Sequence, residues 1–321
     1  MQGRVLITGV TGFAGSHLAE RFVAHGVAVH GLAFEDPPHP NLVRVADRVA
    51  IHKGDITSTD DIRAALDASR PDVVVHLAGQ AVPTQAARDP VGAVRVNVLG
   101  TAALLTAVEE RERLRVVVAS SAEVYGEPMR TPVDEETPTD PKNAYAATKL
   151  AAEAIAREVG ARGRRAVVIL RPMNQIGPRQ HPALAASAFA KQIAEAEAGL
   201  AEPVIRHGSL DARRDFLDVR DMADAYARAC EIDVPGAYVF NVGTGHAVAI
   251  AEILSTLLDL ARTKVRAELD RSLVRHTAPA LALDASRFRA RTGWAPTTDL
   301  RTSLGDLLDY WREQVRVGVR T

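Results

Sequence analysis

The chain has 321 residues, of which 47% are hydrophobic and 25% charged, and its net charge at pH 7 is −1. This length allows a large core in one or two domains, and the near-neutral charge gives no support for a nucleic-acid surface. Cys230 is the single cysteine, which excludes an internal disulfide and a thiolate metal cluster. We expect no metal site, no signal peptide and no apolar stretch of ~20 residues that could span a bilayer, and therefore a cytoplasmic protein.

The first motif along the chain is a glycine-rich turn that follows an apolar run. Val5–Ile7 predict a buried strand, and three glycines at tight spacing come after it. The first two let the backbone turn sharply and approach a ligand, and the third lets the next helix pack closely on the sheet. The start of that helix offers free N–H groups to a pyrophosphate, although such a turn can also be a simple bend. The residues expected to contact a dinucleotide here are Gly9, Thr11, Gly12, Phe13, Ala14 and Gly15.

Short β-rich runs then alternate with helical patterns through the first half of the chain. Several of these strands are apolar throughout, as expected when helices cover both faces of a sheet. The alternation predicts an α/β fold with a doubly wound, parallel Rossmann sheet and right-handed crossovers. The predicted strands are Val5–Thr8, Ala28–Leu32, Val49–His52, Val73–Leu77, Val116–Ser120 and Ala166–Leu170, and the predicted helices are Ala14–His25, Thr59–Ala68, Pro90–Arg111 and Ala144–Val159.

The rhythm changes beyond Arg171-Pro172, where longer helices are separated by short strands. We expect a dinucleotide-binding domain over residues 1–172, to which a segment at about 213–245 returns, and a smaller α+β substrate lobe over residues 173–321. The predicted helices of this part are Ala183–Ala198, Val219–Ile232, Ile250–Ala261 and Leu300–Val317, with strands at Val204–His207 and Tyr238–Val242.

Tyr145 and Lys149 lie four residues apart on a predicted helix, so their side chains share one face, roughly 5–6 Å apart at Cβ. The ordinary pKa of a phenol is near ~10, and an ammonium beside it favours the phenolate, so we expect the pKa of Tyr145 to be lowered. The phenol could then exchange a proton with a sugar hydroxyl while a nicotinamide exchanges hydride with the adjoining carbon. Such a pair is often only a solvated helix face, but the upstream glycine turn favours the catalytic interpretation.

Polar residues also follow the strand predicted at Val116–Ser120. Ligands of parallel sheets bind at the carboxyl ends of the strands, so a serine hydroxyl there can bind the substrate oxygen that Tyr145 protonates. We assign this role to Ser121 and a structural role to Ser120. Glu123 follows two positions later. It is either an acid–base group for an elimination or a carboxylate hydrogen-bonded within its loop.

Together these residues resemble the extended short-chain dehydrogenase/reductase family, over essentially the whole chain. Further matches stand at Gly54-Asp55-Ile56, His76-Leu77-Ala78-Gly79, Asn97-Val98-Leu99-Gly100-Thr101 and Arg171-Pro172-Met173-Asn174. The resemblance implies that NAD(P) lies in the large domain and a sugar nucleotide in the small one. It also implies that Asp55 and Ile56 lie by the adenine and that the cofactor contacts Leu77, Ala78, Gly79, Tyr145 and Lys149.

The second half is similar to the GDP-sugar branch of that family, on the residues at 174–180, 189–193 and 213–221. This resemblance implies that Asn174, Lys191 and Arg214 contact GDP. A cation suits a diphosphate, and an arginine fork binds it in a fixed orientation, although each cation could instead form a surface ion pair. Arg275 is a further candidate clamp, but it lacks the acidic residue that relatives usually carry two or three positions later. Met173 replaces the phenylalanine usual in this branch, a change of small consequence because methionine fills a similar space.

The end of the second predicted strand bears on the choice of cofactor. Ala33 and Phe34 stand where relatives place the residue that selects NAD or NADP, and Glu35 and Asp36 follow. A 2′-phosphate needs a cation and these acids would repel it, so we expect NAD to be preferred weakly. The alternative is that both acids belong only to a solvated loop with Pro37 and Pro38.

These features favour an NAD(P)H-dependent 4-keto reduction of a GDP-6-deoxy-4-keto-hexose, with a GDP-rhamnose-type product. The alternative is a GDP-mannose 4,6-dehydratase with tightly bound NAD(P), in which Glu123 would remove the C5 proton. A 4-epimerase is less favoured because epimerases usually have a small residue there. A non-catalytic dinucleotide sensor is also less favoured, because such proteins typically lose the tyrosine or the lysine. The resemblance further implies a homodimer, paired through the helix Ala144–Val159 and the segment around Thr101–Ala107.

Overall fold

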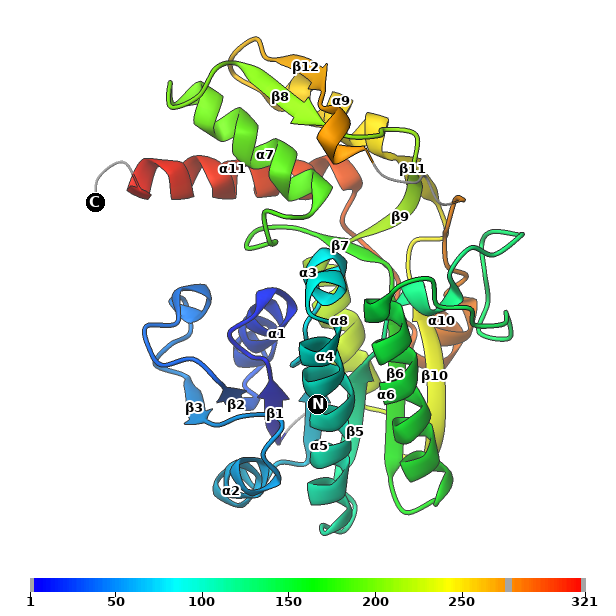
Figure 1. The fold of residues 1–321 in the computed structure, drawn as a ribbon. Coiled ribbons are helices and arrows are strands. Elements are labelled where there is room, and N and C mark those ends of the chain that lie inside the picture. The colour runs from blue at the N-terminus through cyan, green and yellow to red at the C-terminus, as the bar shows by residue number, and fades with distance from the viewer. Residues whose placement is uncertain (1–2, 275–278, 319–321) are drawn as a thin grey trace.

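The computed structural model describes residues 3–274 and 279–318. Its larger lobe is built on a seven-stranded sheet with the strand order β10-β6-β5-β4-β1-β2-β3 (Figure 1). Every neighbouring pair in this sheet is parallel, which confirms the predicted doubly wound α/β fold. The strands are β1 (Arg4–Thr8), β2 (Ala28–Ala33), β3 (Val49–Lys53), β4 (Val73–His76), β5 (Arg115–Ala119), β6 (Ala166–Pro172) and β10 (Gly236–Val242).

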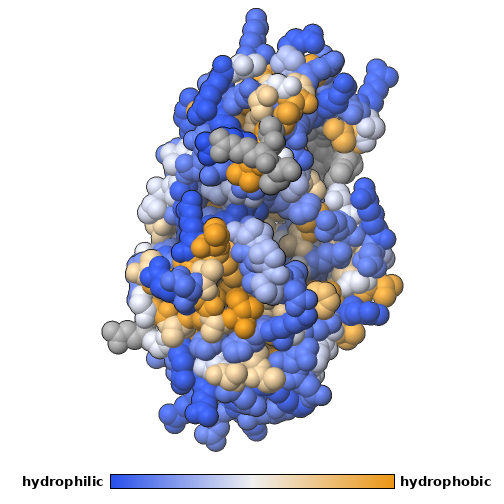
Figure 2. Space-filling model, turned by 90° about the vertical axis from the view of Figure 1, so that its left-hand side faces the viewer, coloured by the Kyte–Doolittle hydropathy of each residue, from blue (hydrophilic) through white to orange (hydrophobic). Residues whose placement is uncertain are grey.

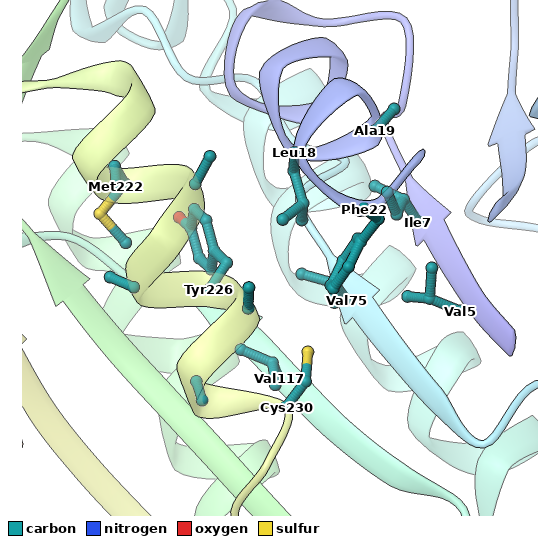
Figure 3. Packing of buried hydrophobic residues seen from close by; sticks show 14 of the residues in the cluster. Val5, Ile7, Leu18, Ala19, Phe22, Val75, Val117, Met222, Tyr226 and Cys230 are labelled. Atoms are coloured by element: carbon teal, nitrogen blue, oxygen red, sulfur yellow. The ribbon is translucent and has the colours of Figure 1, made fainter. Parts of the chain in front are cut away.

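Helices cover both faces of this sheet because alternate strand residues point to opposite sides. On one face, α1 (Phe13–Ala24) and α8 (Val219–Ala229) pack on Val5, Val75 and Val117 (Figure 3). α10 (Ser286–Thr292) adds Phe288 to the same cluster. On the other face, residues one position along these strands, such as Leu6 and Val74, pack on α2 (Thr59–Ser69), α5 (Gly100–Glu109) and α6 (Ala144–Ala161).

The smaller lobe carries a three-stranded sheet, β11-β9-β7, and a two-stranded sheet, β12-β8. A separate apolar cluster, which includes Phe189, Leu257 and Leu304, holds its helices together. The domain boundaries given above stay a prediction. The elements of this lobe are β7 (Asn174–Ile176), α7 (Ala185–Glu197), β8 (Val204–His207), β9 (Arg213–Asp218), β11 (Ala247–Ala249), α9 (Ile250–Leu260), β12 (Arg266–Leu269) and α11 (Leu300–Gly318).

Shorter elements connect these parts. They are α3 (Pro83–Arg88), α4 (Pro90–Ala93), the π-helical turn η2 (Val94–Leu99), and the 3-10 turns η1 (Pro40–Leu42), η3 (Ala122–Tyr125) and η4 (Arg271–Leu273). The single helix predicted at Pro90–Arg111 is therefore divided into α4, η2 and α5. Figure 2, seen from the β3 side, shows an apolar area bordered by hydrophilic surface. Phe34 and Val43, which are 69% and 76% exposed, follow β2 and η1.

Within the described residues, Pro90–Glu109 is long and apolar enough to cross a bilayer by length and composition. The expectation that the chain lacks a stretch of this kind was therefore wrong. Of its 18-residue apolar window, 44% is buried inside the protein, where η2 and α5 pack against α6. A core helix of a globular protein meets the same criterion, so this finding is weak evidence for a membrane span.

Candidate active site

The glycine-rich turn forms a cradle that side chains would fill. Gly9 has a φ of +70°, and a Cβ on it would lie 2.7 Å from the backbone nitrogen of Ala78. A Cβ on Gly15 would lie 2.2 Å from the carbonyl oxygen of Gly9. Gly12 is the N-cap of α1 and supplies no side-chain cap, and the first turn, with Phe13 and Ala14, holds no acidic residue. Backbone N–H groups at such a helix start suit a pyrophosphate, so these residues fit a dinucleotide.

The other residues predicted to contact the cofactor follow the carboxyl ends of β3 and β4, at the same edge of the sheet. Asp55 Oδ1 accepts hydrogen bonds from Thr57 N and Oγ1, at 2.8 and 2.9 Å. A Cβ on Gly100 would lie 3.1 Å from Ile56, so Ile56 packs on α5. A Cβ on Gly79 would lie 3.5 Å from Lys149 Nζ. The loop that follows β4, from Leu77 to Gly79, therefore runs from the glycine turn towards Lys149 on α6.

Tyr145 and Lys149 both face inward from the first turns of α6, where each is 8% exposed. The helix begins after Asn143, whose Oδ1 accepts a hydrogen bond from Ala146 N at 2.8 Å. Lys149 Nζ donates to the carbonyl oxygen of Ala119, the last residue of β5, at 2.8 Å. Ser121 follows that strand end, and its side chain hydrogen-bonds the phenol of Tyr145. The structure thus brings three of the predicted catalytic residues together.

The ionisation of Tyr145 differs from the prediction. Burial and then the negative charge of Glu123 raise the pKa of Tyr145 above its ordinary value, while the hydrogen bond with Ser121 opposes them. The expectation that the pKa of Tyr145 is lowered was wrong for the structure as it stands, because burial and the charge of Glu123 both raise it. Burial also lowers the pKa of Lys149 to about 8. A neutral phenol is a proton donor, which is the form that reduction of a ketone requires.

Glu123 completes the predicted catalytic set from η3. Its Oε2 accepts a hydrogen bond from Asn143 Nδ2 at 2.8 Å, and its negative charge is near enough to raise the pKa of the Tyr145 phenol. Burial raises the pKa of Glu123, while the bond from Asn143 and the charge of Arg214 act against burial. Both interpretations of this residue therefore stand, since it is bonded to Asn143 and its charge also acts on the phenol.

The predicted substrate residues come from three elements of the smaller lobe. Asn174 opens β7 and pairs with Phe216 of β9, two residues after Arg214. The Arg214 guanidinium donates to the carbonyl oxygen of Pro279 at 2.8 Å. Burial lowers the pKa of Arg214, and the charge of Glu123 opposes this shift, so Arg214 lies within electrostatic reach of Glu123.

The other two predicted substrate residues, Lys191 and Arg275, are not placed with Asn174 and Arg214 by these contacts. Lys191, on α7, lies 3.6 Å from Glu195 and 5.6 Å from the centre of the Trp311 ring. This contact matches the alternative given for it above, a surface ion pair. Arg275 lies outside the described residues.

The Asn97 side chain bonds two separate segments near the site, a role that the sequence analysis did not identify. It is buried in the π-helical turn η2, and its Oδ1 accepts from Gln80 N at 2.8 Å. Its Nδ2 donates to Thr148 Oγ1 at 2.9 Å. Because Thr148 lies between Tyr145 and Lys149, this side chain fixes the loop after β4 against α6. π-helical turns are often found at functional sites, but the local sequence pattern does not predict one here.

Arg179 links the two lobes, and it too was missed. It lies between β7 and α7 with a φ of +74°, and its guanidinium donates to Asn41 O at 2.6 Å and to Glu20 Oε2 at 2.9 Å. Asn41 Nδ2 in turn donates to the carbonyl oxygen of Thr11 in the glycine turn, at 2.9 Å. The loop after Asn174 is thereby tied to the cofactor cradle. Contacts between residues so far apart in the sequence leave no signature in the local sequence pattern.

Comparisons with known proteins agree with this geometry. The family model described as GDP-mannose 4,6 dehydratase matches residues 6–307. The GDP-6-deoxy-D-mannose reductase of Pseudomonas aeruginosa is 33% identical over 98% of this chain and 99% of its own length. The UDP-glucose 4-epimerase of Azospirillum brasilense is 30% identical over 92% of this chain and 88% of its own length.

Solved structures point the same way. The structure of RMD from Pseudomonas aeruginosa complexed with NADPH has a TM-score of 0.83 and 32% sequence identity. The match covers 97% of this chain and 99% of that one. With a Rossmann sheet, a glycine cradle and a Tyr145–Lys149 pair now placed at one edge, the chain belongs to the GDP-mannose 4,6 dehydratase family of extended short-chain dehydrogenases/reductases.

Proposed function

We propose that this protein reduces the 4-keto group of a GDP-6-deoxy-4-keto-hexose with NAD(P)H and releases a GDP-rhamnose-type product. The observation that carries this proposal is the buried, neutral phenol of Tyr145, hydrogen-bonded by Ser121 at the sheet edge that also holds the glycine cradle. The likeness to the reductase of Pseudomonas aeruginosa supports it over nearly the full length of both chains. That solved structures of relatives hold NADPH or NAD supports the cofactor class.

In this mechanism the side chains bind the ketone and deliver one proton. The reduced nicotinamide, when bound, supplies the hydride that C4 of the sugar receives. Ser121 donates a hydrogen bond to the C4 oxygen and polarises the carbonyl. Tyr145 then donates its phenolic proton to that oxygen as the alcohol forms. Lys149, whose ammonium lies one turn further along α6, stabilises the phenolate that remains.

The smaller lobe would hold the nucleotide diphosphate. Arg214 and Asn174 come from neighbouring strands, and a guanidinium binds a diphosphate in a fixed orientation. We assign Lys191 and Arg275 to the same task, with Lys191 leaving its partner Glu195 when the anion arrives. In this assignment the nucleotide base is guanine.

Purified protein tests the proposal directly. With GDP-4-keto-6-deoxymannose and reduced cofactor, we expect absorbance at 340 nm to fall as one cofactor is oxidised for each sugar reduced. GDP-mannose without added cofactor should give no product. A stable absorbance with the keto sugar would contradict the proposal.

A second candidate, the 4,6-dehydratase, is favoured by Glu123, a buried carboxylate near enough to Tyr145 to raise the pKa of its phenol. A carboxylate there can remove the C5 proton and assist loss of the C6 hydroxyl. Such an enzyme would turn over GDP-mannose with no added NAD(P)H, and Glu123→Gln would abolish that turnover. The reductase proposed here keeps most of its activity in the same variant, because no step of ketone reduction needs this carboxylate.

Glu35 supports a preference for NAD over NADP. It lies two residues after β2, and its Oε2 accepts a hydrogen bond from Thr11 Oγ1 in the glycine turn at 3.1 Å. A carboxylate held there would repel a 2′-phosphate. We expect a higher kcat/KM for NADH than for NADPH, and we expect Glu35→Gln to raise kcat/KM for NADPH by about tenfold, equivalent to about 1.4 kcal/mol. Equal kcat/KM values for NADH and NADPH in the unchanged protein would contradict a role of Glu35 in cofactor choice.

We further propose a cytoplasmic homodimer. Apolar side chains at Val91 and Leu99, which are 70% and 56% exposed, lie on the helical stretch next to α6. An exposed alanine row on α6, formed by Ala147, Ala151 and Ala154, would allow close packing of a second copy. A monomer mass in sedimentation at micromolar concentration would contradict this assembly.

A further inference from the structure

A row of polar side chains on α6 continues beyond the two catalytic candidates. Tyr145, Lys149 and Glu153 follow one another at intervals of four residues, so they share one face of the helix. All three are buried, and Glu153 is only 1% exposed. A carboxylate removed from water in this way is costly unless it is paired, so its partners indicate what it does.

Glu153 is bonded on both of its oxygens. Arg171, on β6, donates to it twice, from Nε to Oε2 at 3.0 Å and from Nη2 to Oε1 at 2.5 Å. Arg157 adds a third bond, from its Nε to Oε1 at 3.0 Å. The Arg171 guanidinium also donates to the hydroxyl of Tyr125 at 2.7 Å, in the η3 turn that carries Glu123. The pair is thus fixed between α6, β6 and η3.

Through Ser120, this pair reaches the strand end that carries the catalytic groups. Ser120 Oγ donates to Glu153 Oε2 at 3.0 Å, and Ser120 is 4% exposed. The residue before it, Ala119, accepts the hydrogen bond of the Lys149 ammonium. The residue after it, Ser121, bonds Tyr145. This side-chain bond therefore adds to the backbone hydrogen bond from Ser120 N to Leu170 O, at 2.8 Å, in holding the three-residue segment that meets both Lys149 and Tyr145.

We propose that Glu153, fixed by Arg171, is a positioning residue that acts through Ser120. It holds the Ala119 carbonyl against the Lys149 ammonium and the Ser121 hydroxyl against the phenol. Its effect on the reaction rate depends on the function proposed above, whereas its effect on the Lys149 ammonium does not. A carbonyl that accepts a hydrogen bond from an ammonium favours the charged form, so loosening the segment lowers the pKa of Lys149.

Other charged groups near Lys149 must stay constant in a test of this idea. His76 on β4 is close enough for the Lys149 charge to lower its pKa. The charge of Glu123 on η3 raises the pKa of the phenol, and the charge of Arg214 on β9 acts on Glu123. Arg157 and Arg171 face Glu153, and Glu135 lines a cavity of about 320 Å³ beside them. Ser120→Ala changes none of these groups and removes only the hydroxyl.

The test uses the full chain with lysine labelled with ¹³C at Cε, whose chemical shift reports protonation of Nζ. The resonance that disappears from the spectrum of the Lys149→Arg variant is assigned to Lys149. We expect Ser120→Ala to lower the pKa of Lys149 by about half to one pH unit and to reduce kcat about tenfold. The KM for cofactor should stay within twofold, and Ser120→Thr, which keeps the hydroxyl, should restore both values. The matched control is Ser69→Ala, a buried serine on α2 that bonds only Ala65 O among described contacts.

The outcomes separate the two proposals. If Ser120→Ala leaves the pKa of Lys149 unchanged, the positioning role is wrong, whatever the enzyme reduces. If that pKa falls while no keto sugar is reduced, the positioning role stands and the proposed function fails. A Glu153→Gln variant that folds should lower the pKa of Lys149 at least as far, because it removes a negative charge as well.

Discussion

Replacing Tyr145 with phenylalanine lowers kcat by roughly 10²- to 10⁴-fold, the usual contribution of one positioned acid–base group. The ring fills the same buried space, so the fold and the affinity for cofactor change little. Steady-state rates with the 4-keto sugar measure the loss, and titration of the reduced cofactor measures the binding.

Tyr226→Phe is the matched control for this variant. Tyr226 is a buried tyrosine on α8, near enough that its own pKa responds to Tyr145, yet it has no part in the mechanism. We expect it to keep kcat within a few fold of the unchanged protein. Normal turnover by Tyr145→Phe would show that the phenol is not the proton donor and would revive the idea of a non-catalytic sensor.

Replacing Gly15 with alanine removes cofactor binding. The added methyl would lie 2.2 Å from the Gly9 carbonyl oxygen and 2.9 Å from Val10 Cα. Both contacts are with backbone, which cannot swing away as a side chain can. Relief of the clash moves the cradle, and overpacking of this kind costs about 1–3 kcal/mol of stability. We expect at least a 100-fold loss of affinity for the reduced cofactor by calorimetric titration, together with a lower Tm.

Gly305→Ala provides the comparison for that substitution. Gly305 is also helical, in α11, and the nearest atom to an added methyl is Leu260 Cδ1 at 3.9 Å. We expect this variant to bind cofactor normally and to gain up to about 1 kcal/mol, because alanine favours a helix over glycine. Normal cofactor affinity in Gly15→Ala would mean that the turn does not hold the dinucleotide.

Much of the fold could be predicted because its signals are local. An apolar strand, a glycine turn and a helix pattern each occupy a few neighbouring residues, and alternation of such units fixes a parallel sheet. The short strands β7, β9 and β11 were missed, since β9 is rich in charge and its sequence, Arg213–Asp218, resembles a loop. Its pairing with β7 and β11 stabilises it instead.

The candidate site divides in the same way. Tyr145 and Lys149 could be predicted because four residues separate them on one helix. The ionisation of Tyr145 could not, since it depends on burial by the whole fold and on Glu123 from another element. Arg179, Asn97 and the Glu153–Arg171 pair bond segments far apart in sequence. Only the tertiary structure brings such partners together.

Transfer of deuterium tests the central claim most directly. Reduced cofactor that carries deuterium at the transferring position of its nicotinamide is incubated with the protein and GDP-4-keto-6-deoxymannose, and the sugar product is examined by NMR and mass spectrometry. A reductase places one deuterium at C4 of each product molecule. A product without deuterium at C4, or turnover of GDP-mannose with hydrogen moved within the sugar, would contradict the account.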